Sequence, residues 1–140
     1  MSRFNPLSRW MAGMVVVAIM LGGCASSPKS DDDIVIERAQ ARWDALVSGD
    51  LETAYTYLSP GYRSSHSLID YGVTQRVRKV QYASATYRKH TCEASRCLVT
   101  FSVGFKVYNP VPGAGVYESS SAIEDTWIKT DGQWWYLPKK

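Results

Sequence analysis

The sequence predicts one α+β domain, in which N-terminal helices pack on an antiparallel sheet of about four strands. Before about residue 72, apolar residues recur at three- and four-residue spacing, which is typical of amphipathic helices. After about residue 77, apolar and polar residues alternate, which is typical of half-buried strands. The length of 140 residues suits a single domain of this kind.

The composition excludes several classes of protein. Apolar residues make up 45% of the chain and charged residues 21%, which excludes a wholly disordered chain, a collagen-like repeat and a disulfide-dense miniprotein. The formal net charge of +3 is too small to indicate a nucleic-acid-binding protein by itself.

Residues 1–23 have the pattern of an export signal. Arg3 and Arg9 make the N-terminal region positively charged, and the segment Trp10–Leu21 that follows is almost entirely apolar. This apolar run of about a dozen residues is shorter than the roughly 20 residues that a membrane-spanning helix needs. The small residues Gly22 and Gly23 follow it, as expected before a cleavage site.

The run Leu21–Cys24 resembles the lipobox of bacterial lipoproteins. The resemblance implies that Cys24 receives a lipid, that the chain is cut before it, and that the new amine is acylated, because two or more acyl chains anchor a protein stably. Ser26 is not aspartate, so the resemblance implies the periplasmic face of the outer membrane. The alternatives are an uncleaved anchor helix and an ordinary signal with a chance cysteine. Residues 24–32 would form a flexible tether and residues 33–140 the folded domain.

Helical periodicity predicts a first helix over Ile34–Ser48. The acidic run Asp31–Asp33 supplies an N-cap and favourable charge at its start, and Gly49 stands where a C-cap glycine belongs. Asp50 then resembles the N-cap of a second helix over Leu51–Leu58, which Ser59-Pro60-Gly61 ends. The segment Ser64–Gly72 is expected to hold one further turn.

The remaining chain predicts a meander of four strands. The expected order is a strand over Val77–Lys89, a strand that starts at Cys97 and runs to Tyr108, a loop over Asn109–Gly115, a strand over Val116–Thr130, an Asp131-Gly132 turn, and a strand over Gln133–Leu137. Cys92 and Cys97 flank the first turn of this meander. In an oxidising compartment they should form a disulfide, since two thiols make a poor zinc site and their spacing is not that of a redox pair.

Three stretches of the chain resemble the nuclear transport factor 2-like superfamily. They are Ala41–Arg63, the cysteine-bounded hairpin, and Glu124–Tyr136 with its Asp-Gly turn. The resemblance covers roughly residues 33–140 and implies a cone, in which a curved antiparallel sheet wraps over an N-terminal helical hairpin. Members include isomerases, dehydratases, carrier modules and envelope lipoproteins, and the chain is most similar to the lipoproteins. The fold therefore indicates no single activity.

The closing hairpin decides which carboxylate points into such a cone, where the superfamily's enzymes place their Asp, His or Tyr. One face carries Asp125, Trp127, Lys129, Trp134 and Tyr136, and the other carries Glu124, Thr126, Ile128, Trp135 and Leu137. We expect the first face to point inward because it has the larger aromatic load. Asp125 is then the inward carboxylate, and Glu124 is the alternative.

An inward carboxylate is a candidate for catalysis, because burial raises the pKa of a carboxyl group and prepares it as a general base. The alternative is a carboxylate at the rim, bonded to tyrosine or arginine. The residues expected to line the interior are Phe101, Val103, Phe105, Trp127, Trp134 and Tyr136. The bulky residues on the inner face of the second strand, Val99, Phe101, Val103 and Phe105, leave little room for a cavity, which favours a scaffold over an enzyme.

The histidines and the basic residues indicate no site. His66 has Asp70 four residues on but is interpreted as a solvated loop residue, and His90 is expected to be exposed at a hairpin end. Two isolated histidines do not predict a metal site, and no motif predicts a cofactor.

Positive charge gathers on the expected first strand and its turn, at Arg76, Arg78, Lys79, Arg88, Lys89 and His90. This charge could meet an acidic partner or lipid headgroups, but we favour a solvated edge that resists aggregation.

Two functional hypotheses follow from these observations. The first is a non-catalytic, membrane-tethered module that binds an envelope protein, a peptidoglycan fragment or a small apolar ligand. The second is an isomerase- or dehydratase-type enzyme that uses an inward carboxylate. An open pocket with Asp125 or Glu124 near a Tyr or His favours the enzyme, and a closed aromatic core excludes it. The expected compartment holds no nucleic acid, and the sequence does not indicate an oligomeric state.

Overall fold

The computed structural model describes residues 27–108 and 111–139. In chain order they form the helices α1 (Asp31–Ser48), α2 (Leu51–Thr56), α3 (Pro60–Ser65) and α4 (Leu68–Val77), followed by the strands β1 (Val80–Glu93), β2 (Arg96–Tyr108), β3 (Val116–Thr130) and β4 (Gln133–Leu137). The predicted signal, the lipid attachment at Cys24 and the first residues of the tether lie outside the described residues.

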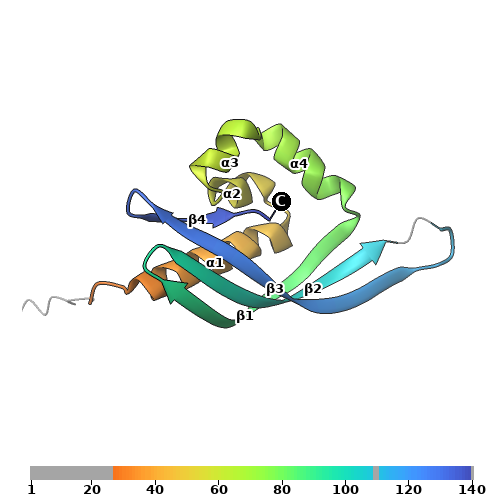
Figure 1. Ribbon diagram of the computed structural model, residues 1–140. Helices are drawn as coiled ribbons and strands as arrows, with labels where there is room; N and C mark the ends of the chain where they lie inside the picture. The colour runs from red at the N-terminus through yellow and green to blue at the C-terminus, as the bar shows by residue number, and fades with distance from the viewer. Residues whose placement is uncertain (1–26, 109–110, 140) are drawn as a thin grey trace, which may run out of the picture.

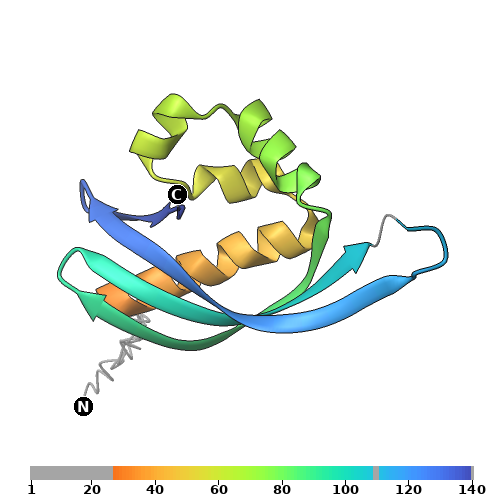
Figure 2. The ribbon, with the colours of Figure 1, turned by 45° about the vertical axis from the view of Figure 1, so that its right-hand side comes forward.

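The strands form one antiparallel sheet in the order β1-β2-β3-β4. The sheet curves around α1, and all four helices lie on its concave side (Figures 1 and 2). The predicted α+β class, with helices on a curved sheet of four strands, is confirmed. None of the helices among the described residues is long and apolar enough to cross a membrane.

Helix α1 begins three residues earlier than predicted, because its N-cap is Ser30 and not the acidic run. The Ser30 hydroxyl accepts a hydrogen bond from the backbone N–H of Asp33 at 3.1 Å. The three aspartates therefore occupy the first turn, where their charge complements the helix dipole. Gly49 ends α1 in the left-handed conformation, with φ of 77°, as predicted.

The sequence prediction missed helix α3 and shortened α4. Ser59 was interpreted as part of a stop signal, but its hydroxyl caps α3 and Pro60 occupies the first turn of that helix. Helix α4 runs on through Val77, past the expected single turn. The Ser67 and Asp70 side chains form a capping box at its start, which stabilises it.

The strands follow the prediction, except that β1 starts at Val80 and runs on to Glu93, past the expected end at Lys89, and β2 starts at Arg96. Cys97, Val99, Phe101 and Val103 alternate as the buried face of β2. The Asp131-Gly132 turn has positive φ at both residues, 52° and 75°, as a two-residue hairpin of the predicted type requires. Strand β3 pairs Trp127 with Tyr136 and Lys129 with Trp134, so these residues share one face of the sheet, as predicted.

Strand β4 also fastens the sheet to the helical layer. The Tyr136 N–H donates to the Tyr57 carbonyl at 2.8 Å, and the Ser59 N–H donates to the Tyr136 carbonyl at 2.9 Å. The Arg38 guanidinium on α1 donates to the Trp134 carbonyl at 2.8 Å. These bonds join α1 and the α2–α3 junction to the last strand of the chain.

Candidate functional site

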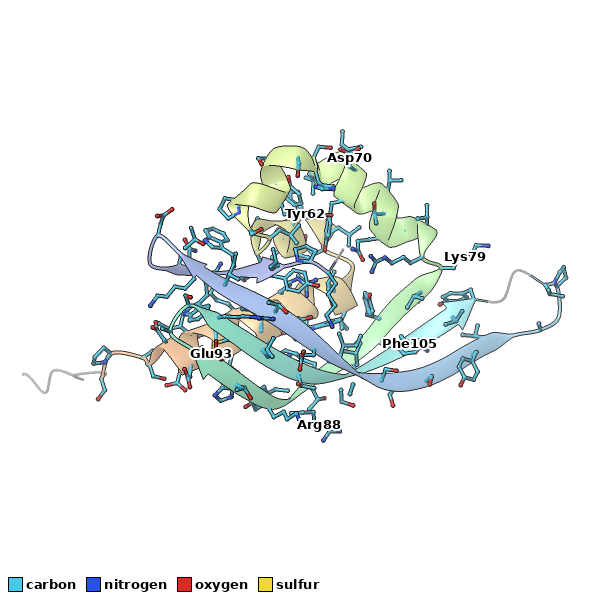
Figure 3. All side chains as sticks on the ribbon, in the orientation of Figure 1. Tyr62, Asp70, Lys79, Arg88, Glu93 and Phe105 are labelled. Atoms are coloured by element: carbon cyan, nitrogen blue, oxygen red, sulfur yellow. A yellow bond between two sulfur atoms is a disulfide. The ribbon has the colours of Figure 1, made fainter. Side chains whose placement is uncertain are left out.

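A pocket of about 250 Å³ lies on the concave side of the sheet, between α1, α4 and the C-terminal strands. Its walls combine aromatic and charged side chains, and they are formed by Arg42, Trp43, Leu46, Tyr62, Tyr71, Thr74, Gln75, Arg78, Tyr82, Ile123, Glu124, Asp125, Tyr136, Pro138 and Lys139. Figure 3 shows Tyr62 in this space between the helices and the sheet. We refer to this space as the cone pocket.

The cone pocket contains a buried ion pair between α1 and β3. The side chains of Arg42 and Asp125 are 6% and 2% exposed, and the Arg42 Nη1 lies 3.2 Å from the Asp125 Oδ2. The Trp43 Nε1 donates a second hydrogen bond to the same oxygen at 2.8 Å. The Arg42 guanidinium also stacks over the Tyr136 ring, 3.5 Å from its centroid. The pair is therefore fixed from both layers of the fold.

The structure places Asp125 on the inner face, as predicted, and pairs it with an arginine, as in the alternative interpretation, but the carboxylate is buried and not at a rim. Glu124 is exposed and borders the cone pocket. Burial raises the pKa of Asp125, while the Arg42 charge and the Trp43 hydrogen bond act against this rise. Burial therefore favours the protonated carboxyl, whereas Arg42 and Trp43 favour the charged carboxylate. Opposed influences of this kind are common at catalytic carboxyls.

Two tyrosines of the cone pocket offer further polar groups. The Tyr71 hydroxyl is buried beside the Arg42 guanidinium, which can only donate to it, and its own proton has no acceptor among the described residues. Burial raises the pKa of both Tyr71 and Tyr136, so both phenols are protonated at neutral pH. A protonated phenol whose proton has no acceptor can donate a hydrogen bond to a ligand. Without such a ligand, a buried donor that makes no hydrogen bond lowers the stability of the fold.

Of the six residues expected to line the interior, Tyr136 borders the cone pocket. Phe101, Val103, Trp127 and Trp134 are instead packed in the hydrophobic core, and Phe105 is half-buried. The expectation that bulky side chains leave little cavity was wrong, because a pocket of about 250 Å³ lies beside these residues, under α4. Sequence reasoning missed Arg42 and Tyr71. Arg42 occupies a core position of α1 between Ala39 and Leu46, and an arginine at such a position is a signal for a buried charge.

A second, more open hollow of about 400 Å³ adjoins the cone pocket and shares Leu46, Gln75 and Tyr82 with it. It lies between the ends of α1 and α4 and the start of β1. Its charged residues, Arg76 and Lys79, are exposed. Because it holds no buried polar pair, the cone pocket is the better candidate for specific recognition.

The histidines lie outside the cone pocket, and of the six basic residues noted in the sequence Arg78 alone lines it. His66 stacks on Tyr62 at 4.1 Å, while the Asp70 carboxylate bonds to Ser67, so the structure does not form the His66–Asp70 pair. His90 is half-buried and not exposed, because it bonds to the Tyr87 hydroxyl at 2.7 Å and approaches Asp32 at 3.3 Å. The Cys92 sulfur lies near this group but belongs to a disulfide, which leaves too few ligands for a metal.

The six basic residues do not share one strand. Arg76, Arg78 and Lys79 lie at the end of α4 and before β1, whereas Arg88, Lys89 and His90 lie within β1. Figure 3 shows Lys79 at the junction of α4 and β1, with Arg88 on the side of the sheet that faces away from the helices.

Cys92 and Cys97 form a disulfide across the β1–β2 turn, where the two residues are also paired in the sheet register. Cys97 is fully buried, so the bridge joins the tip of this hairpin to the core. It lies on the turn and contributes no group to the cone pocket.

The fold is shared with solved structures at low sequence identity. A SEC-C motif-containing protein from Rhodopseudomonas palustris matches with a TM-score of 0.55 at 17% identity, over 72% of this chain and 73% of that one. A candidate dehydratase of the nuclear transport factor 2-like family from Streptomyces avermitilis matches with a TM-score of 0.55 at 14% identity, over 81% of this chain and 99% of that one. A SEC-C motif-containing protein from Psychrobacter arcticus matches with a TM-score of 0.53 at 16% identity, over 80% of this chain and 63% of that one.

At identities of this size, the likeness concerns the fold and not the activity. No protein-family model matches the sequence, and no curated protein matches it.

Proposed function

Starting from a nuclear transport factor 2-like fold, we propose that this chain is a lipid-anchored envelope protein that binds a small ligand in the cone pocket. One observation carries the binding role: an open pocket with five aromatic side chains reaches a buried Arg42–Asp125 pair and a Tyr71 hydroxyl whose proton has no acceptor among the described residues. Pockets with apolar walls and a few converging polar groups are the usual form of small-molecule sites. The anchor is supported by the resemblance of Leu21–Cys24 to a lipobox.

The pocket chemistry favours a ligand with an aromatic or apolar body and one polar group. Five aromatic side chains line the walls and would stack on a flat body: Trp43, Tyr62, Tyr71, Tyr82 and Tyr136. At the buried end, the Tyr71 hydroxyl and the Arg42 guanidinium are hydrogen-bond donors, which suit a carbonyl or carboxylate oxygen. This ligand is more polar than the small apolar ligand expected from the sequence.

A second candidate function is catalysis by Asp125, and the open pocket favours it. Asp125 lines the same space as Tyr71 and Tyr136, which is the arrangement that the enzyme hypothesis requires. Binding remains our first proposal because the Asp125 Oδ2 already accepts hydrogen bonds from both Arg42 and Trp43. Both interactions act against the rise in the pKa of Asp125 that burial causes, so they weaken the carboxylate as a base.

The binding role is tested by a thermal-shift screen of aromatic carboxylic acids and phenols against the purified chain. We expect a subset to raise the melting temperature, and we expect Tyr71→Phe to reduce that rise. Tyr117→Phe is the matched control, because Tyr117 is 66% exposed on β3 and does not line the cone pocket. If no compound raises the melting temperature, or if both variants respond like the parent, the cone pocket is not the binding site.

The same compounds separate binding from catalysis. Each compound that binds is incubated with the chain and then analysed by NMR for chemical change. An unchanged compound supports the binding module. If the chain converts a compound, and the Asp125→Asn chain still binds that compound without converting it, the protein is an enzyme and not a binding module.

The anchor is tested by Cys24→Ser. We expect this variant to leave the membrane fraction and appear among the soluble proteins, because it lacks the thiol that carries the lipid. Ser26→Ala is the control and should stay with the membrane. Unchanged membrane retention of Cys24→Ser would contradict the lipobox interpretation.

A further inference from the structure

The two edges of the sheet are protected to different degrees. An unpaired strand edge exposes backbone N–H and C=O groups that can pair with another chain, and proteins usually block it with bulges or lysines. The β1 edge has both devices. The β1–β2 register shifts between Tyr82 and Ser84 and again between Tyr87 and Lys89, and Arg88 and Lys89 are exposed beside the second shift.

The opposite edge is open along half of β3. Strand β4 pairs only with Thr126–Thr130, so the segment Val116–Ala122 has β2 on one side and no strand on the other among the described residues. The β2–β3 register runs through this segment without a bulge. Figure 2 shows β2 and β3 extending together beyond the helical layer. We call Val116–Ala122 the free edge.

The free edge has few of the features that prevent pairing. It contains no proline and no lysine. Its one charged residue, Glu118, is paired with Lys106 on β2 at 2.8 Å. Val116 and Tyr117 are 49% and 66% exposed, although strands normally cover residues of this kind. A largely exposed and nearly uncharged edge of this length, with no bulge in its register, is a site for strand addition.

We infer that the free edge pairs with the free edge of a second copy of this chain, with β3 antiparallel to β3. In a two-fold pair centred on Ser119, Val116 of one copy lies opposite Ala122 of the other, and Tyr117 lies opposite Ser121. Glu118 then lies opposite Ser120, so no like charges and no two large side chains face each other. The result is one continuous sheet through both copies, with an interface in which the same residues serve both sides.

The size of the edge sets the strength of the association. A single strand pair buries less than the roughly 800 Å² per partner of a standard stable interface. The dimer should therefore be weak and dependent on concentration in solution. If the proposed lipid anchor holds, confinement to a membrane surface would raise the effective concentration and favour pairing. The pairing itself does not depend on the anchor or on a ligand.

Disulfide trapping tests the pairing in the full-length chain with Cys24→Ser, purified in a mild detergent. A cysteine at the two-fold centre faces its own copy at about 4.5–5.5 Å between Cα atoms, which a disulfide can bridge. On mild oxidation, Ser119→Cys should form at least tenfold more covalent dimer than Thr86→Cys. Thr86 is the matched control because it is an exposed strand residue on the protected β1 edge.

A charge at the same centre gives a second, non-covalent test. Ser119→Lys places two lysines opposite each other in the pair, which should abolish the concentration-dependent rise in mass measured by light scattering of the Cys24→Ser chain. Circular dichroism checks that each variant is folded. Equal trapping of Ser119→Cys and Thr86→Cys would overturn the inference. A dimer that persists in Ser119→Lys would place the interface elsewhere, and a monomer at all concentrations would leave the free edge to a strand of another protein.

Discussion

At the scale of single residues, the Arg42–Asp125 pair is the least usual feature of the molecule. Two side chains that are normally solvated are 6% and 2% exposed and meet at 3.2 Å. Burying such charges costs several kcal/mol for each ion, and their attraction offsets this cost only when the geometry is good. The intact pair therefore contributes little net stability to the fold. Removal of one partner alone nevertheless destabilises the fold strongly, because the other charge stays buried and unpaired.

This asymmetry predicts the outcome of a double-mutant cycle. Asp125→Leu or Arg42→Met alone should lower the free energy of unfolding by about 3–5 kcal/mol, because each leaves an uncompensated buried charge. The double variant should recover most of that loss, since it buries two apolar side chains instead. Urea unfolding measures all four chains. Losses that simply add in the double variant would show that the two groups do not stabilise each other.

Asp125 also predicts a dependence of stability on pH. Burial raises the pKa of Asp125 above its ordinary value of 3.8, so the folded chain holds this proton at pH values where the unfolded chain has released it. Between 3.8 and the raised pKa, the contribution of Asp125 to the free energy of unfolding should therefore decrease as the pH rises.

Asp125→Asn removes the titrating proton and should remove this component of the pH profile. The measurement is urea unfolding at a series of pH values above 3.8 for both chains. Identical slopes for the two chains would show that the pKa of Asp125 is the same in the folded and unfolded states.

At the scale of elements, strands were easier to predict than helices. The alternation of Cys97, Val99, Phe101 and Val103 identifies the buried face of β2 directly, since a strand has only two faces. The closing hairpin was also predictable, because the Asp131-Gly132 turn sets its register. Helix α3 was missed because Ser59 and Pro60 serve equally well to end one helix and to start the next.

The disulfide belongs to this scale, because it closes a single turn. Its loop is short, so we expect reduction to lower the free energy of unfolding by only about 2 kcal/mol. Urea unfolding with and without a reductant measures this difference. The Cys92→Ala, Cys97→Ala chain is the control, and its midpoint should not respond to reductant. A parent chain that is equally insensitive would show that the thiols are free.

At the scale of the whole molecule, the site could be predicted only in part. The inward direction of Asp125 follows from the pairing of two adjacent strands, which is local information. Its partner Arg42 lies 83 residues earlier, and no periodicity indicates that these two side chains meet. The pocket itself depends on how far α4 stands from the sheet, and this distance is a property of the packed fold.

The whole fold also depends on its last strand. Deletion of residues 133–140 removes Trp134, which is 1% exposed, and the β4 bonds to Tyr57, Ser59 and Arg38. We expect this chain to lose cooperative unfolding, measured by far-ultraviolet circular dichroism in urea. Deletion of residues 138–140 retains β4 and should unfold cooperatively. A cooperative transition in the longer deletion would show that the helical layer closes without β4.

The position of β4 at the end of the chain has a consequence for the timing of folding. The helices emerge first from the ribosome, but the groups on Tyr57, Ser59 and Arg38 have no strand to bond until Trp134 and Tyr136 follow them. The bonds that join the two layers therefore form only after β4 has been made, however early the helices form. The last strand of the described chain thus controls when the helical layer and the sheet close on each other.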